Sequence, residues 1–203
     1  MGLFAQALPL KFLGNPVLRQ VAKPLSKKEI KSSSTRDLIK GMEKTVAKYE
    51  GVGLAAPQVG ISKRVLLVVV PETSPPIPCT VMINPRLTDT APSVDSIGTW
   101  EACLSIPGMF GFVPRRPNIQ VDYLDEKGKP FRITASGFPA VVIQHEIDHL
   151  DGKLFLDHIK RDDLMCEEEW MSRNYDIDQG FGNWTKTELP ESETSNFEYG
   201  PSN

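Results

Sequence analysis

Residues 138–152 read FPAVVIQHEIDHLDG and predict the helix around which the rest of the chain is arranged. Pro139 suits a first helical turn and Gly152 a position just past the end, so the helix is expected over about 138–150. His145 and His149 then lie one turn apart on one face, where two imidazoles can bind a single metal ion. Glu146 lies about 100° around the helix, where it can transfer protons without binding the metal.

A chance occurrence of this pattern on a polar helix face is the alternative, and the composition argues against it. The chain contains only three histidines, and two of them flank Glu146 at the metal-binding spacing. The surrounding residues are largely apolar, so these polar side chains would be buried and would need a reason to be there. The stretch therefore predicts a metal site.

A catalytic metal also needs a third protein ligand and an open position for water. His158 lies nine residues after His149, whereas the zincin protease pattern would place a third histidine at Phe155. Upstream, Cys103 offers a thiol among small and polar residues in a predicted loop. A lone cysteine is usually an inert core residue, so the spacing alone leaves the third ligand open.

Length and composition describe one ordinary domain with a tail. The chain has 203 residues, 40% of them hydrophobic and 24% charged, which is typical of a soluble globular protein. Its longest aliphatic run, residues 65–70, is far shorter than a membrane span, and the first residues do not resemble a secretory signal. Three cysteines are too few for a disulfide framework, so we expect a reducing compartment: the bacterial cytoplasm, or alternatively an organelle.

The remaining pattern predicts an α+β fold. Apolar residues at helical spacing predict an N-terminal helix over 35–50, capped at Ser34, and residues 51–60 (GVGLAAPQVG) are expected to form a loop. The proline-rich residues 71–80 are expected to be irregular. Strands are expected at 65–70, at 81–85, and in a hairpin formed by 118–124 and 131–135. The expected architecture has short, mostly antiparallel strands packed around a central metal-bearing helix, with an N-terminal helix and a C-terminal tail.

Charge divides the chain at about residue 161. Residues 162–203 contain eleven acidic and two basic residues, a net charge of −9, whereas residues 1–161 carry a net charge of +6. We expect a catalytic body over 1–161 and an acidic extension over 162–203, with a short helix near 164–171 and a partly unstructured tail. The mildly basic body is compatible with contact to RNA, although ordinary solubilising charge is the simpler explanation.

Three segments taken together resemble the signature motifs of one enzyme family. Residues 51–58 (GVGLAAPQ), 101–105 (EACLS) and 145–149 (HEIDH) occur in this order and closely resemble the three motifs of the peptide deformylases. The resemblance extends to three flanking segments, 14–19 (GNPVLR), 113–115 (VPR) and 150–152 (LDG). It covers most of the chain, about residues 8–160, and leaves the acidic extension without a clear counterpart.

The resemblance implies that the chain removes the N-formyl group from the initiator methionine of newly made polypeptides and releases formate. It implies three metal ligands: Cys103, His145 and His149. A water activated by the metal would attack the formyl carbon, with Glu146 as general base and then general acid. The Gln58 side-chain amide and the Leu104 backbone N–H would stabilise the oxyanion. One divalent ion per chain is implied, Fe²⁺ in vivo, with Zn²⁺, Ni²⁺ or Co²⁺ possible in purified protein.

The same motifs indicate how a substrate would bind. Missing side chains would let a peptide pair like an added strand with the backbone around Val52 and Gly53. The methionine side chain needs an apolar pocket, for which four residues are candidates: Val52, Phe138, Val141 and Val142. Glu101 and Arg115 are expected to pair and to brace the cysteine segment behind the metal.

The chain departs from the family pattern in three places. Ala102 stands where the cysteine motif usually has glycine, and it adds a methyl group beside the substrate path. Phe110 stands where some members carry a basic residue. The acidic extension replaces the basic C-terminal helix with which some members reach the ribosome, so any ribosome contact is expected to be transient and to use the basic body. We expect nascent formyl-methionyl peptides as partners, no DNA, no membrane, and a monomer.

Two other functions could use the same helix. A zinc metalloprotease of the His-Glu-x-x-His type would cleave internal peptide bonds without using Cys103 as a ligand. A non-catalytic binding protein would close the metal site with a fourth protein ligand. Three motifs in the right order favour the deformylase over both.

Overall fold

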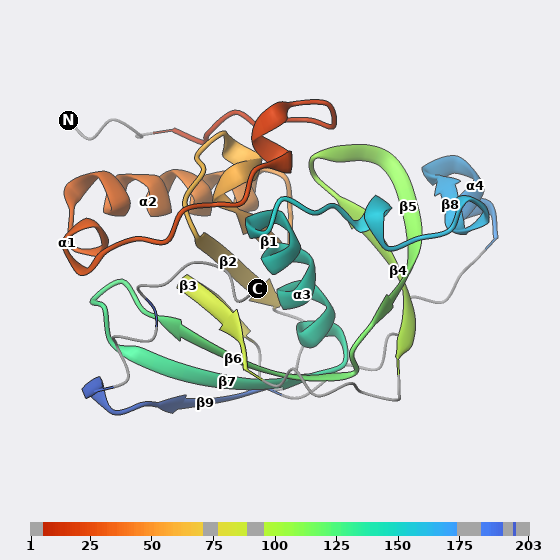
Figure 1. Ribbon diagram of the computed structural model, residues 1–203. Helices are drawn as coiled ribbons and strands as arrows, with labels where there is room; N and C mark the ends of the chain where they lie inside the picture. The colour runs from red at the N-terminus through yellow and green to blue at the C-terminus, as the bar shows by residue number, and fades with distance from the viewer. Residues whose placement is uncertain (1–5, 71–76, 89–95, 174–183, 193–196, 198–203) are drawn as a thin grey trace.

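The computed structural model describes residues 6–70, 77–88, 96–173, 184–192 and 197, and it has the predicted α+β architecture (Figure 1). The α-helices are α1 (Lys27–Ile30), α2 (Ser33–Lys48), α3 (Phe138–Leu150) and α4 (Glu167–Ser172). The strands are β1 (Gly53–Ala55), β2 (Val65–Val70), β3 (Ile77–Leu87), β4 (Ile97–Cys103), β5 (Ile106–Arg115), β6 (Asn118–Leu124), β7 (Pro130–Ser136), β8 (Leu164–Cys166) and β9 (Trp184–Glu188). None of the described helices is long and apolar enough to cross a membrane.

The strands form two sheets in which all the described strand pairs are antiparallel. One sheet has the order β1-β2-β3-β6-β7-β9, and the other has the order β4-β5-β8. Helix α3 packs against β1, β2 and β7 and lies at the centre of the molecule, with the three-stranded sheet on its other side (Figure 1). The helix that carries His145 and His149 is therefore central, as predicted.

Helix α2 forms because its apolar residues fall on one face. Leu38, Ile39, Met42 and Val46 are all buried, and they join the core that covers one side of the six-stranded sheet. The helix begins at Ser33, and the Ser32 side chain accepts a hydrogen bond from the Thr35 backbone N–H. The predicted cap at Ser34 was therefore wrong by two residues.

Helix α3 has the predicted bounds, 138–150, and nearly all of its side chains are buried. Burial on every face is expected for a helix enclosed between two sheets rather than lying on the surface. The predicted hairpin is confirmed by the pairing of β6 with β7, and the predicted strand at 65–70 is β2.

Two segments expected to be irregular contain strands. Within residues 51–60, Gly53–Ala55 forms β1, and Ala56–Val59 forms a 3₁₀ helix. Strand β3 begins at Ile77 instead of 81, while residues 71–76 of the proline-rich segment lie outside the described residues. Proline is tolerated at position 78 because this part of β3 pairs with β2 only, and pairing with β6 begins further along the strand.

The acidic extension contributes to both sheets, which the sequence did not predict. Strand β8 pairs with β5, and β9 pairs with β7 at the edge of the larger sheet. The short helix predicted near 164–171 is present as α4, but it begins only at Glu167, because residues 164–166 form β8. The expectation of an unstructured tail falls partly on residues 174–183, 193–196 and 198–203, which lie outside the described residues, and a division of the chain at residue 161 stays a prediction.

Candidate active site

A cavity of about 610 Å³ opens between helix α3, the segment before β1, and the β4–β5 hairpin. Its lining includes all of the predicted substrate-binding residues: Val52, Gly53, Ala102, Phe138, Val141 and Val142. Cys103, His145, Glu146 and Gln58 line the same cavity. Residues that are scattered over about ninety positions of sequence therefore meet in a single cleft.

Cys103, His145 and His149 form the one group of possible metal ligands found among the described residues. Their ligand atoms all lie within 4.8 Å of one another, and all three side chains are buried. Cys103 Sγ lies 3.3 Å from His149 Nε2. The cysteine was expected in a loop, but it ends strand β4 immediately before the tight turn into β5, so its position is set by sheet pairing.

The surroundings of these three side chains fit a divalent metal ion. His145 Nδ1 lies 2.8 Å from Glu101 Oε2, which leaves Nε2 for the cluster. Burial acts to raise the pKa of the Cys103 thiol, but the charge of His149 and hydrogen bonds with both imidazoles hold that pKa well below its usual value. A thiolate with two imidazole nitrogens is a common ligand set for zinc or another first-row transition metal, and the adjoining cavity leaves one side open.

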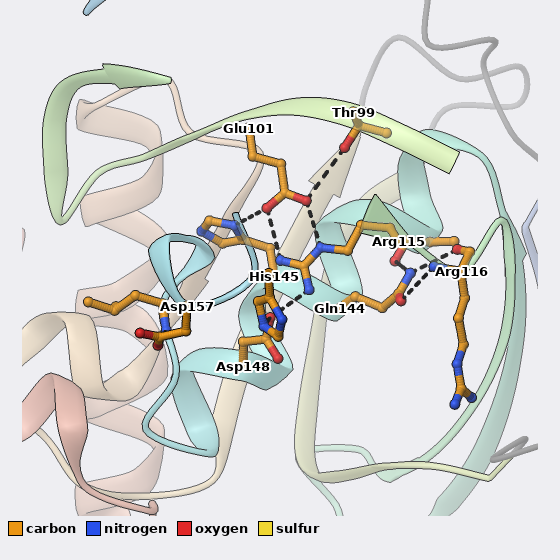
Figure 2. Close-up of polar contacts among 11 residues, drawn as sticks. Thr99, Glu101, Arg115, Arg116, Gln144, His145, Asp148 and Asp157 are labelled. Carbon is orange, nitrogen blue, oxygen red and sulfur yellow. Dashed lines mark hydrogen bonds and ion pairs between the residues drawn. The ribbon is translucent and has the colours of Figure 1, made fainter. Parts of the chain in front are cut away.

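Glu101 holds the His145 imidazole in place and is itself held by Arg115. Arg115 Nε donates to Glu101 Oε1 at 2.6 Å and Nη2 donates to Oε2 at 2.9 Å, so the predicted Glu101–Arg115 contact is present (Figure 2). Burial acts to raise the pKa of Glu101, yet the hydrogen bonds from Arg115 and His145 lower it to about 2. The carboxylate is therefore charged and oriented toward the imidazole.

The buried network continues to a residue that the sequence did not single out. Arg115 Nη1 donates to Asp148 Oδ2 at 2.5 Å, and His158 Nε2 lies 2.9 Å from the same oxygen. His158 is thus paired with Asp148 and is not part of the ligand cluster, in agreement with its poor spacing. Asp148 occupies a variable position of the His-Glu-x-x-His pattern, so no spacing rule identifies it.

Glu146 is buried beside the ligand cluster. Its Oε2 makes no hydrogen bond with any described residue, and burial raises the pKa of the carboxyl group to about 7. A carboxyl group with a pKa near neutrality can both accept and release a proton, which is the behaviour a general base and acid requires. Its environment therefore fits proton transfer.

Gln58 points its side-chain nitrogen at the cluster. Its Oε1 accepts a hydrogen bond from the Ala55 backbone N–H at 2.7 Å, and its Nε2 lies 3.6 Å from Cys103 Sγ. The first contact fixes the amide orientation, so the N–H groups face the cleft. Leu104 follows the cysteine in the turn and also lines the cavity.

Alanine at position 102 carries no backbone strain. Among the described residues other than glycine, only Glu50 and Asn84 have positive φ, so Ala102 adopts an ordinary strand conformation. It pairs with Phe110 on β5, and both residues line the cavity. The methyl group therefore changes the shape of the cleft and does not distort the backbone.

Four aromatic residues that line the cavity were not predicted to do so: Phe12, Tyr49, Trp100 and Phe110. The signal was available in part, since Trp100 and Ala102 share a face if residues 97–103 form a strand. The cysteine segment was expected to be a loop, in which side chains do not alternate between two faces, so the shared face was not predicted.

The fold and the cleft together define a class of protein. It is an α+β protein in which a central His-Glu-x-x-His helix and a cysteine at the end of a strand form a candidate metal site beside a cavity of about 610 Å³. The sequence model of one family, described as polypeptide deformylase, matches residues 8–164. Because this match covers most of the chain, the chain belongs to the polypeptide deformylase family, which is a family of enzymes.

Individual relatives agree with this assignment. The peptide deformylase of Thermosynechococcus vestitus is 42% identical over 161 residues, which are 79% of this chain and 83% of that protein. The peptide deformylase of Leptospira biflexa is 37% identical over 163 residues, 77% of this chain and 90% of that protein. A crystal structure of the class I type b peptide deformylase of Acinetobacter baumannii with bound Met-Ala-Ser is 37% identical, with a TM-score of 0.70 and coverage of 76% of this chain and 100% of that one.

Proposed function

We propose that this chain removes the N-formyl group from peptides that begin with formyl-methionine, releasing formate. The observation that carries the proposal is that Cys103, His145 and His149 lie together beside an apolar cleft. Glu146 lines the same cleft, and its buried Oε2 has no hydrogen-bond partner among the described residues. Family membership supports the same activity, and the bound Met-Ala-Ser in the Acinetobacter relative has the sequence expected of a deformylated product.

Cys103, His145 and His149 would hold one divalent metal ion, which would act as a Lewis acid and acidify a water molecule at neutral pH. Glu101 orients His145 through the 2.8 Å contact, and Arg115 keeps Glu101 charged. A loss of either partner would leave the imidazole free to rotate out of the cluster. The ligand set suits several metals, and we propose Fe²⁺ as the ion used in vivo, with Zn²⁺, Ni²⁺ or Co²⁺ in purified protein.

Glu146 would carry the proton during hydrolysis. Its buried carboxylate accepts a proton from the attacking water and returns it to the amine that leaves as the C–N bond breaks. Two other carboxylates line the cleft, but Glu101 is already paired with Arg115 and Glu50 is exposed, so Glu146 is the buried carboxylate left for this role.

Two N–H donors would stabilise the oxyanion that develops on the formyl oxygen. The Gln58 side-chain amide is held by the Ala55 backbone and directed toward Cys103. The backbone N–H of Leu104 follows Cys103 directly in the chain. Preorganised donors in a buried site are worth more than the same donors in water, because they need no reorientation as charge develops.

The substrate would bind as an extra strand. Strand β1 lies at the edge of the six-stranded sheet, so among the described residues no strand pairs with one side of its backbone. Phe138, Val141 and Val142 on α3 provide an apolar surface in the same cleft for the methionine side chain. As partners we propose nascent formyl-methionyl peptides, together with a transient ribosome contact by the monomeric chain in the bacterial cytoplasm or in an organelle.

The direct test is a formate-release assay on formyl-Met-Ala-Ser with protein loaded anaerobically with iron. We expect stoichiometric formate and free Met-Ala-Ser, with no cleavage of internal peptide bonds in casein. Casein digestion without formate release would instead favour a metalloprotease.

Glycine at position 53 is expected to be required for full activity. A Cβ atom at this position would lie 2.5 Å from Glu146 Oε1 and 2.9 Å from its Cδ, so a Gly53→Ala substitution must displace the carboxylate. Displacement of a catalytic group by about 1 Å can cost about 100-fold in rate, and we expect kcat to fall by about that factor. Metal content and Tm serve as controls and should stay close to wild type. A variant with wild-type kcat would show that the position of Glu146 is not critical.

A further inference from the structure

One wall of the cleft is aromatic and comes from the three-stranded sheet. Trp100 on β4 and Phe110 on β5 line the cavity together with Ala102, which is the cross-strand partner of Phe110. Residues two apart on a strand point to the same face, so Trp100 and Ala102 lie on one face of β4. The wall therefore starts next to the metal-binding Cys103 and extends away from it.

The acidic extension supports this wall from behind. Trp170 on α4 is largely buried, and its ring stacks on Phe110 with a centroid distance of 4.3 Å and an interplanar angle of 4°. Strand β8 pairs with β5, with Phe110 opposite Met165, and this pairing holds α4 beside β5 (Figure 1). The Trp170 indole packs against one face of the Phe110 ring, and this contact favours the observed plane of the ring.

The cleft thus offers two separate apolar surfaces. Phe138, Val141 and Val142 belong to α3, whereas Trp100 and Phe110 belong to the β4–β5 hairpin. A peptide paired with β1 is extended, and its consecutive side chains point to opposite faces. If the methionine side chain occupies the α3 surface, the side chain that follows it must face elsewhere in the cleft.

We propose that Trp100 and Phe110 select substrates in which a large apolar residue follows formyl-methionine, and that Trp170 is a positioning residue that acts through Phe110. This inference rests on the proposed deformylase function. Flat aromatic rings held in place bind leucine or phenylalanine side chains well, because apolar area is buried with little loss of side-chain freedom. The two rings provide no charged group or hydrogen-bond partner that would stabilise an aspartate or a serine at this position.

The test compares kcat/KM for formate release from formyl-Met-Phe-Ser, formyl-Met-Ala-Ser and formyl-Met-Asp-Ser. For the wild-type enzyme we expect kcat/KM on the phenylalanine peptide to exceed that on the alanine peptide by about tenfold, mainly through a lower KM. Trp170→Ala should reduce this ratio to about two or less, and Trp170→Phe should restore most of it. Met171→Ala is the matched control, because Met171 is the exposed neighbour of Trp170 on the same helix, and it should leave the ratio unchanged.

Phe110→Ala provides a second variant that removes the stacked ring without altering α4, and it should lower the ratio in the same way. Equal kcat/KM of the wild-type enzyme on the phenylalanine and alanine peptides would overturn the inference and leave the proposed function standing. A Trp170→Ala variant that loses the same fraction of kcat/KM on all three peptides would also overturn it, since that result indicates a purely structural role. Absence of formate from every peptide would overturn the proposed function and this inference with it.

Discussion

A Glu146→Gln variant is expected to bind one metal ion per chain and yet to lose about 10²–10⁴-fold in kcat for formate release. Glutamine keeps the size of the side chain and can still fill the space beside Gly53 and the ligand cluster. It cannot accept the proton of the attacking water or deliver a proton to the leaving amine. The loss should therefore appear in kcat, while KM for formyl-Met-Ala-Ser changes little.

The measurement combines steady-state kinetics with the metal content of the same preparation. Glu168→Gln is a suitable control because Glu168 is exposed on α4 and is outside the cleft lining. It should match the wild-type enzyme in both metal content and kcat. If Glu146→Gln kept more than about a tenth of the wild-type kcat, another group would have to carry the proton.

The second large effect is expected from substitution of Cys103, the proposed sulfur ligand. Cys103→Ala leaves only the two imidazoles of the cluster. Mutation of a residue that merely supports a ligand costs about 10–100-fold in metal affinity, so we expect loss of the thiol itself to lower the affinity by more than about 100-fold. Turnover should fall to background together with the metal. The measurement is metal content after dialysis, followed by competition with a chromophoric chelator.

The control for this experiment is Cys79→Ala, because Cys79 is an exposed free cysteine at a position on β3 that is outside the active-site cleft. It should retain one metal ion per chain and full turnover. A Cys103→Ala protein that still bound one equivalent of metal with wild-type affinity would show that the thiol is not a ligand. That outcome would favour the alternative function, a metalloprotease that does not use Cys103 as a ligand.

Predictions that depended on local pattern agree well with the structure. Helix α3 has the bounds expected from Pro139 and Gly152, and the β6–β7 hairpin pairs as expected. The errors occurred where short strands lie in segments rich in glycine or proline, as in β1 and the start of β3. Such strands have little propensity of their own and form because a neighbouring strand satisfies their backbone hydrogen bonds.

The residues of the candidate site also fall into those predicted from local pattern and those that were not. Spacing alone indicated His145, Glu146 and His149, whereas Cys103 and Gln58 were indicated only by resemblance to a family. Asp148, Trp170 and the aromatic wall were not predicted, because their contacts join α3 to β5 and the acidic extension to the cleft. No periodicity along the chain describes a contact between segments that are far apart in sequence.

By itself the sequence determined which side chains share the face of one helix, since a period of 3.6 residues places His145 and His149 together without any help from the rest of the fold. Only the tertiary structure decided that a sulfur forty-two positions earlier meets them, that Glu101 and Arg115 stand behind His145, and that Trp170 stacks on Phe110. The physical reason is that helix geometry is set by local backbone hydrogen bonds. The contacts between distant residues form only after the strands have paired into two sheets and α3 has packed against them.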